Sequence, residues 1–287
     1  MSSLVLNGEV VEKAEASVPV DDRGFILGDG LFETMRAYNG VVFRVTDHLE
    51  RLANSCRFFN IHPPWDNSEL CAMIDSLLEK NGLLSARVRV TLTRGPHSGS
   101  MGLPREENPT LLITAEELPE DMDKMTSDGI SLSTANVRFH SDIEITRHKT
   151  LNRMPNLLAR SQAEEAGADE ALILDARGNV ATCSTGNIFF VQYEQLFTPP
   201  LTAPILPGVT RKAVLGLAEG EGIPIREDFF SPIVFAGADE AFLTNSVREL
   251  EPVVEVNNQQ VGSGRPGPVF KRLLELYRKE AREAGEV

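Results

Sequence analysis

A short basic run in the second half of the chain contains the side chain best suited to nucleophilic chemistry. Arg147, His148, Lys149 and Arg153 fall within seven positions, and residues 145–163 contain no acidic side chain. Neighbouring cations lower the pKa of a lysine amine, which makes it a usable nucleophile near neutral pH. The charge pattern by itself favours a solvated basic loop, and an anion-attracting pocket around Lys149 is the functional alternative.

Two other segments have the composition of a phosphate site. Residues 207–210 (PGVT) open a predicted helix, where free backbone N–H groups, the helix dipole and the Thr210 hydroxyl can bind an anion. Residues 244–246 (TNS) directly follow an apolar strand, and the Ser246 hydroxyl is a second candidate. Each segment is a weak signal alone, because many helices begin this way without a ligand and hydroxyls are common in turns.

The overall charge of the chain excludes several classes of partner. It has 42 acidic and 28 basic residues, for a net charge of −14, so we expect no binding to nucleic acid or to membranes. No apolar stretch is long enough to span a bilayer, and the first residues lack the basic start of a signal peptide. The three cysteines lack metal-ligand spacing, so we expect reduced thiols in a cytoplasmic protein without a bound metal.

Turn residues and apolar periodicity predict the elements that must hold these side chains. Two Asn-Gly pairs, at residues 7–8 and 39–40, each predict a β-hairpin. A helix is expected to begin at Asp47, which can cap it. In the second half, a strand over residues 180–191 is expected to pair with residues 171–174.

These elements predict an α+β chain of two domains, rich in hairpins rather than in βαβ units. Residues 119–128 are acidic, contain a proline and have few apolar side chains, so we expect them to form the linker. The first domain is then an α+β domain over residues 1–118. The second, over residues 129–287, is expected to carry Lys149.

Motifs along the whole chain occur in the order found in one enzyme family. The matching segments are 28–34 (GDGLFET), 39–40 (NG), 48–52 (HLERL), 148–153 (HKTLNR), 169–171 (DEA), 187–189 (NIF), 207–210 (PGVT) and 244–246 (TNS). In these segments the chain resembles the class IV aminotransferases. These are fold-type IV enzymes that use pyridoxal 5′-phosphate (PLP), and they include branched-chain and D-amino acid transaminases and aminodeoxychorismate lyase.

The resemblance implies the two-domain fold-type IV fold and a role for each matching residue. Lys149 would hold PLP as a Schiff base and then move a proton between substrate and cofactor. The groups implied to bind the cofactor phosphate are the Arg51 side chain, the backbone N–H groups of Val209 and Thr210, and the hydroxyls of Thr210 and Ser246. The implied substrate contacts are Phe32, Arg89 and Asn245. For Arg89, a strand arginine that faces solvent is an equally good interpretation.

One position departs from the family pattern. Relatives carry a glutamate that pairs with the pyridine nitrogen of PLP, and Thr182 stands at that position here. A hydroxyl supplies no negative charge, so we expect the cofactor ring to stabilise a carbanion less well. Such a site fits elimination of a β-substituent at least as well as amino transfer.

The predicted function is transfer of an amino group between an amino acid and a 2-oxo acid by a PLP enzyme. The alternative is aminodeoxychorismate lyase, because residues 149–153 (KTLNR) are closer to lyases than to branched-chain transaminases. A non-catalytic relative that binds PLP is a third possibility. The resemblance also implies a homodimer, since the family completes its site with a loop of the neighbouring subunit.

Overall fold

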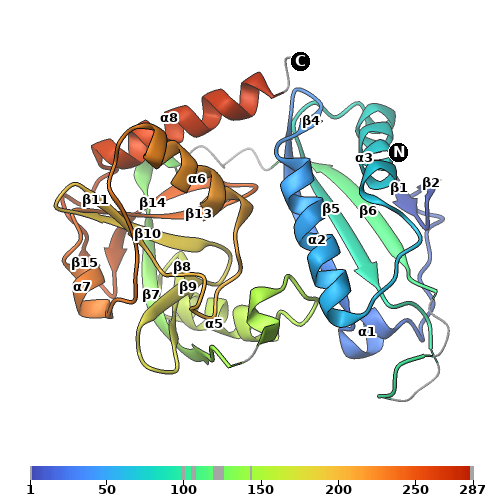
Figure 1. The fold of residues 1–287 in the computed structure, drawn as a ribbon, viewed down its shortest axis with the longest axis horizontal. Helices are drawn as coiled ribbons and strands as arrows, with labels where there is room; N and C mark the ends of the chain where they lie inside the picture. The colour runs from blue at the N-terminus through green and yellow to red at the C-terminus, as the bar shows by residue number, and fades with distance from the viewer. Residues whose placement is uncertain (1, 98–100, 105–107, 119–125, 143, 285–287) are drawn as a thin grey trace. The chain divides into compact units, whose positions relative to one another are not determined.

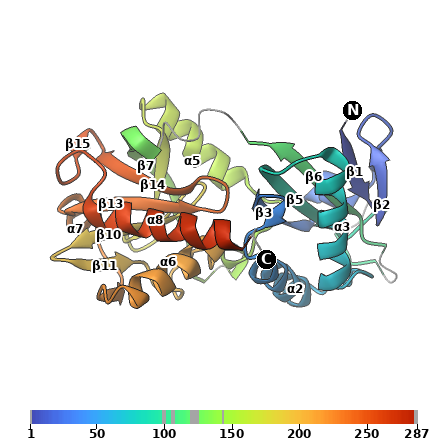
Figure 2. The ribbon, with the colours of Figure 1, turned by 90° about the horizontal axis from the view of Figure 1, so that it is seen from above.

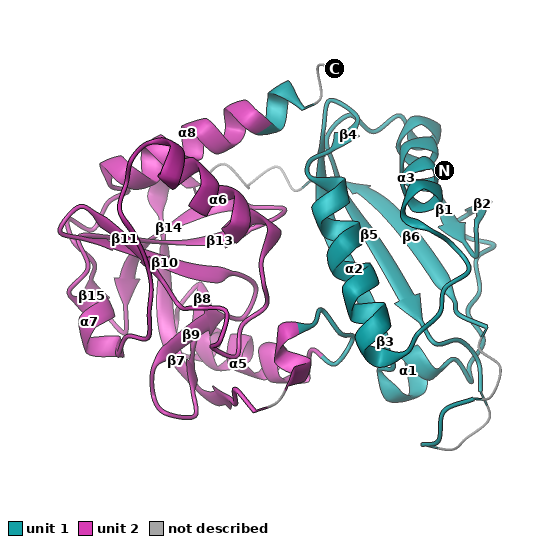
Figure 3. Ribbon diagram, in the orientation of Figure 1, with its two compact units in different colours: residues 1–118, 148–152, 281–287 teal, residues 119–147, 153–280 magenta. Residues whose placement is uncertain are grey.

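The computed structural model describes residues 2–97, 101–104, 108–118, 126–142 and 144–284. Contacts within the chain divide it into two compact units, shown in Figure 3. Unit 1 comprises residues 1–118, 148–152 and 281–287, and unit 2 comprises residues 119–147 and 153–280. The expected linker, 119–128, falls mostly on residues 119–125, which lie outside the described residues.

Unit 1 is an antiparallel six-stranded sheet with two long helices on one face (Figures 1 and 2). In spatial order the strands are β2 (Glu9–Glu12), β1 (Ser3–Leu6), β6 (Leu111–Glu117), β5 (Ala86–Thr93), β3 (Gly30–Tyr38) and β4 (Val41–Val42). The helices are α1 (Arg23–Leu27), α2 (Val45–Phe59) and α3 (Asn67–Asn81). Both predicted hairpins are confirmed: Asn7 and Asn39 each have φ 51°, and a glycine of positive φ follows each of them.

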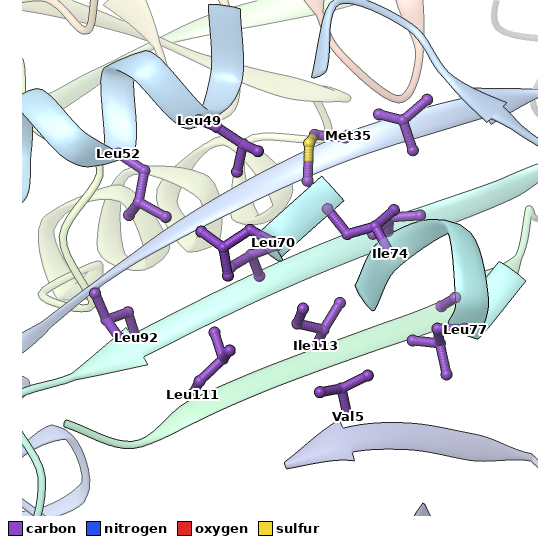
Figure 4. Packing of buried hydrophobic residues seen from close by; sticks show 14 of the residues in the cluster. Val5, Met35, Leu49, Leu52, Leu70, Ile74, Leu77, Leu92, Leu111 and Ile113 are labelled. Carbon is purple, nitrogen blue, oxygen red and sulfur yellow. The ribbon is translucent and has the colours of Figure 1, made fainter. Parts of the chain in front are cut away.

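The core of unit 1 lies between the sheet and helices α2 and α3 (Figure 4). Side chains alternate along β3, so Leu31, Met35 and Ala37 enter this core while Phe32 and Thr34 belong to the opposite face. The same alternation in β5 sends its valines to the core and its arginines to the other face. The face without helices is therefore free to carry polar side chains.

Helix α2 begins two residues earlier than the sequence indicated. Its first residue is Val45, which follows Arg44 in a left-handed conformation with φ 52°. Asp47 does not cap the helix. It lies in the first turn, where its carboxylate forms an ion pair with Arg44 at 3.2 Å.

Unit 2 is a nine-stranded mixed sheet with helices on both sides. The path of strands is β12 (Ile225–Glu227), β11 (Gln195–Thr198), β10 (Asn187–Gln192), β13 (Glu240–Asn245), β14 (Glu249–Val256), β7 (Ile130–Phe139), β8 (Glu170–Asp175) and β9 (Val180–Cys183), with β15 (Gln259–Gln260) paired to β14. The helical elements are η1 (Glu144–Arg147), α5 (Met154–Glu165), α6 (Val209–Gly220), α7 (Pro232–Ala236) and α8 (Pro268–Glu283). Figure 2 shows α5 on the opposite side of the sheet from α6 and α8.

The strand expected over residues 180–191 is broken into β9 and β10 by a turn at residues 184–186. The Cys183 N–H donates across this turn to the Gly186 carbonyl at 2.9 Å. A side chain at Gly186 would lie 2.6 Å from the Thr244 carbonyl oxygen, so the turn packs closely on β13. No helix of the described residues has the length and apolar character that a membrane span requires.

Candidate active site

Lys149 lies beside β3 in unit 1. The segment 148–152 runs along the start of this strand, where the Phe32 N–H donates to the Lys149 carbonyl at 2.9 Å and the Leu151 N–H donates to the Gly30 carbonyl at 3.0 Å. These bonds give the physical reason why the segment groups with unit 1. The division expected from sequence differed here, because it assigned Lys149 to the second domain.

The ring of Phe32 brings two cationic side chains together. Lys149 Nζ lies 4.6 Å from the ring centroid, and the guanidinium carbon of Arg89 lies 3.9 Å from it. Arg89 also donates to the Thr91 hydroxyl at 3.1 Å. Among the residues that the structure describes, Arg89 has no carboxylate partner. Burial and the nearby Arg87 charge lower the pKa of Arg89, which nevertheless stays a cation.

Behind β3, a buried glutamate holds a second arginine. Glu33 Oε1 accepts from Arg51 Nε at 2.8 Å, and Glu33 Oε2 accepts from Arg51 Nη2 at 2.6 Å. His48 Nδ1 lies 2.8 Å from the same Oε2. Burial raises the pKa of Glu33, but the Arg51 charge and the hydrogen bonds from His48 and Arg51 outweigh it and lower the pKa to about 2. Burial also lowers the pKa of His48, and Glu33 does not reverse that effect.

The other members of the basic run have partners of their own. Arg147 forms an ion pair with Glu144 at 3.3 Å, and Arg153 donates to a backbone carbonyl of unit 2 at 3.1 Å. His148 stacks on Phe58 with 4.3 Å between the ring centroids. These side chains therefore anchor the chain on both flanks of the lysine in sequence.

In unit 2, the start of α6 has the features of an anion site. Gly208 is its N-cap and supplies no side-chain cap, and a Cβ there would lie 2.1 Å from Asn187 Oδ1. Val209 and Thr210 are the first residues of this 12-residue helix, and its first turn contains no acidic side chain. The Thr210 hydroxyl lies 3.5 Å from the Ser246 hydroxyl. Two backbone N–H groups and two hydroxyls thus belong to one small region.

Thr182, on β9, is buried and uses its hydrogen locally. Its hydroxyl donates to the Gly186 carbonyl at 2.8 Å, across the turn that separates β9 from β10. A hydroxyl has one hydrogen and two lone pairs, so in this arrangement Thr182 can only accept a hydrogen bond from a further group.

A fully buried glutamate organises the same turn. Glu170 accepts hydrogen bonds from the backbone N–H groups of Ala171 at 2.7 Å and Ser184 at 3.1 Å, and from the Thr185 hydroxyl at 2.6 Å. Two arginines complete its surroundings. The nearest nitrogens of Arg160 and Arg248 lie 3.4 and 3.6 Å from Glu170 Oε2.

The turn between β13 and β14 is tied to the turn between β9 and β10. Asn245 donates through its amide nitrogen to the Thr185 carbonyl at 2.9 Å, and its amide oxygen accepts from the N–H groups of Val247 at 2.8 Å and Arg248 at 3.1 Å. The sequence analysis gave Asn245 a substrate contact. Its amide is occupied by these turn contacts, so it stabilises the loop that carries Ser246.

Glu33, His48 and Glu170 belong to motif segments, but the sequence analysis gave them no role. A signal existed for Glu33, because strand alternation sets it on the same face as Leu31, Met35 and Ala37, and an acid on an apolar face needs a partner. Glu170 lies in an unbroken run of buried residues in β8. Which residues pair with these acids depends on tertiary contacts that no spacing rule predicts.

Comparisons with known proteins identify the family. The model of the family described as amino-transferase class IV matches residues 30–256. A putative branched-chain-amino-acid aminotransferase of Methanocaldococcus jannaschii is 36% identical, over 96% of this chain and 95% of the relative. A D-alanine aminotransferase of Staphylococcus haemolyticus is 32% identical, over 97% of this chain and 98% of the relative.

Solved structures agree with this result. The branched-chain amino acid aminotransferase of Escherichia coli superposes with a TM-score of 0.94 at 30% identity, over 97% of this chain and 94% of that chain. A second branched-chain amino acid aminotransferase, from T.th. and complexed with N-(5′-phosphopyridoxyl)-L-glutamate, gives a TM-score of 0.92 at 28% identity, over 99% of this chain and 95% of that chain.

The chain belongs to the class IV aminotransferases and has their fold-type IV architecture. It is a PLP-dependent enzyme of the transaminase kind, as the resemblance predicted. The relatives named here are aminotransferases, which favours transfer over the lyase alternative.

The residues present fit the cofactor. PLP carries a phosphate dianion, and the start of α6 offers free N–H groups at a helix N-terminus together with two hydroxyls. The absence of a cap side chain at Gly208 leaves these N–H groups for an external acceptor. The Lys149 amine, against the Phe32 ring, is suited to the aldehyde.

Proposed function

We propose that Lys149 is the residue that binds PLP covalently, and that Arg89 receives a carboxylate of the amino acid or 2-oxo acid. The observation that carries this proposal is the shared position of both cations on the Phe32 ring. Arg89 has no carboxylate partner among the described residues, so a substrate carboxylate would compensate its charge. Phe32 is then the apolar wall between the reacting amine and the recognition arginine.

The phosphate ligands in this proposal are Arg51 in unit 1 and Val209, Thr210 and Ser246 in unit 2. Their support is the guanidinium held by Glu33 and the uncapped N-terminus of α6. Positive charge, oriented N–H groups and hydroxyls are the donors that a phosphate dianion accepts best.

The protein's own part in the reaction is positioning and proton transfer. Bound PLP supplies an electrophilic aldehyde and a conjugated ring that accepts electrons from the substrate. Lys149 Nζ, once free of the cofactor, is the base that takes the proton from the substrate Cα and the acid that returns it. Thr182 can accept a hydrogen bond from the ring but adds no charge, so we propose slower proton removal than a carboxylate at this position would give.

Substrates of the relatives define the range to be tested. The relatives are named for branched-chain amino acids and D-alanine, and one solved structure contains an adduct with L-glutamate. We propose that this enzyme uses an amino acid as donor and a 2-oxo acid as acceptor. Assays should therefore include both enantiomers of alanine and glutamate, and leucine.

Changing Arg89 to methionine is expected to lower kcat/KM about 10- to 100-fold, the effect of losing a charge-assisted hydrogen bond. The loss should appear mainly in KM, because the arginine binds the carboxylate in both the ground state and the transition state. Steady-state kinetics over the substrate panel would measure it.

Arg87→Met is the matched control for this substitution. Arg87 lies on the same face of β5, but it is half exposed and pairs with Glu116. A loss confined to glutamate would assign Arg89 to a side-chain carboxylate, and a loss with every substrate would assign it to the α-carboxylate. Equal kinetics for Arg89→Met and the unmodified enzyme would refute the role.

We also propose a cytoplasmic homodimer. The free cysteines Cys56, Cys71 and Cys183 support a reducing compartment. An apolar surface on unit 1 supports association, since Phe25 and Met101 are 78% and 82% exposed. Sedimentation equilibrium should give twice the chain mass, and a fully active species of single chain mass would contradict the dimer.

A further inference from the structure

A buried acid occupies the apolar face of β3. Glu33 is 1% exposed and shares this face with Leu31, Met35 and Ala37, all of which belong to the core between the sheet and α2. An ionised carboxylate is stable in such a place only when it is fully compensated. Its partners, His48 and Arg51, both lie on α2.

The geometry of the pair fixes the orientation of the guanidinium. Arg51 faces Glu33 with its Nε and Nη2 atoms, each bonded to a different carboxylate oxygen at 2.8 and 2.6 Å. Two parallel bonds of this kind set both the direction and the plane of the guanidinium, whereas a single bond would leave it free to rotate. A guanidinium has five N–H donors, so those on the edges away from Glu33 are directed as a consequence.

His48 supports the carboxylate without adding charge. Glu33 is ionised near neutral pH, since its pKa is lowered to about 2, and it has no hydrogen to donate. The short contact at 2.8 Å therefore requires that Nδ1 of His48 carries the proton. Burial lowers the pKa of His48, so the imidazole stays neutral.

We propose that Glu33 is a positioning residue that orients Arg51 toward the phosphate of PLP, with the His48 N–H as a second constraint on the carboxylate. This inference rests on the phosphate role proposed for Arg51. It gives a function to a buried charge that the core would otherwise exclude. It also makes a prediction of definite sign, because a carboxylate that served only to neutralise Arg51 would weaken the binding of an anionic cofactor.

The test compares PLP with pyridoxal, which has the same aldehyde and ring but no phosphate. Equilibrium dissociation constants are measured on apoprotein by absorbance, and the ratio of Kd for pyridoxal to Kd for PLP reports the phosphate contribution alone. Glu33→Gln is expected to lower this ratio about 10- to 100-fold, the effect of losing a charge-assisted hydrogen bond. Arg51→Met is expected to lower it by a similar factor.

The double variant E33Q/R51M separates positioning from a second, independent effect. If Glu33 acts through Arg51, the double variant has the same ratio as Arg51→Met within about twofold, the usual error of additivity. An unchanged ratio in Glu33→Gln, a higher ratio or full additivity with Arg51→Met would each overturn the inference. An unchanged ratio in Arg51→Met would instead refute the proposed phosphate role, and the inference with it.

Two further variants guard against a general folding defect. Asp22→Asn changes another fully buried acid of unit 1, which accepts from the Gly24 N–H at 2.7 Å and from the Thr93 and Thr110 hydroxyls at 2.9 and 2.7 Å. It should affect PLP and pyridoxal equally. Glu33→Asp keeps the charge but shortens the side chain, so it should fold and still lower the ratio. A normal ratio in Glu33→Asp would show that the charge alone suffices and would overturn the positioning role.

Discussion

Replacing Lys149 with alanine is expected to lower the transaminase rate by at least about 10²- to 10⁴-fold, the contribution of a positioned acid–base group. The residue combines two tasks, because the same Nζ atom would bind the cofactor and move the substrate proton. Phe32 fixes where the amine lies, and the backbone bonds of residues 148–152 to β3 fix the segment that carries it.

The measurement has a kinetic part and a chemical part. Steady-state rates with an amino acid and a 2-oxo acid give the loss, and borohydride reduction followed by peptide mass spectrometry locates the covalently held cofactor. Lys80→Ala is a suitable control, since Lys80 is exposed near the end of α3. Cofactor reduced onto a different lysine, or more than a tenth of the activity in Lys149→Ala, would be incompatible with the assignment.

Replacing Glu170 with glutamine is expected to reduce the free energy of unfolding by about 3–5 kcal/mol, the cost of breaking a buried ion pair from one side. The carboxylate is completely buried and accepts from Ala171, Ser184 and Thr185, and its Oε2 faces Arg160 and Arg248. An amide would direct N–H groups at these donors or leave the arginines without a charge partner. Urea unfolding followed by circular dichroism would measure the change.

Glu251→Gln is the informative comparison, because Glu251 is also buried beside Arg248, with 3.1 Å between Oε2 and Nε. Burial raises the pKa of Glu251 from 4.5 to about 7, although Arg248 opposes the shift. The folded protein thus keeps a proton that the unfolded chain releases above pH 4.5. Stability of the unmodified protein should therefore fall, relative to Glu251→Gln, as pH rises from about 4.5 to 7.

At pH 6 the Glu251→Gln change replaces one neutral group by another, so its effect should stay below that of Glu170→Gln. A loss of equal size for the two variants at that pH would show that the network does not distinguish the two acids. A flat stability difference between Glu251→Gln and the unmodified protein across this range would show that Glu251 is ionised throughout.

Local sequence signals predicted the elements well wherever the physics is local. The Asn-Gly turns, the apolar stripes of the helices and the proline at the start of α5 each depend on a few adjacent residues. The start of α2 differed because Arg44 adopts a left-handed conformation that its residue type does not announce. The break between β9 and β10 depends on close packing of Gly186 against β13, which is a tertiary contact.

The candidate site was predictable in its parts but not in its supports. Lys149, Arg51 and Thr210 stand in motifs, so their types and order identified them. Glu33 and Glu170 are ordinary acids in sequence, and only the fold shows that each is buried against arginines distant along the chain. The pairing of residues 148–152 with β3 likewise joins segments more than a hundred residues apart.

That pairing has a consequence during synthesis of the protein. The strands of the unit 1 sheet are all made once residue 117 has been added, but β4 covers β3 only at Ala37 and Tyr38. Residues 30–32 therefore remain an open strand edge until residues 148–152 leave the ribosome, and open edges pair readily with other chains. The segment that carries the reactive amine is thus also the one that protects the nascent sheet from aggregation.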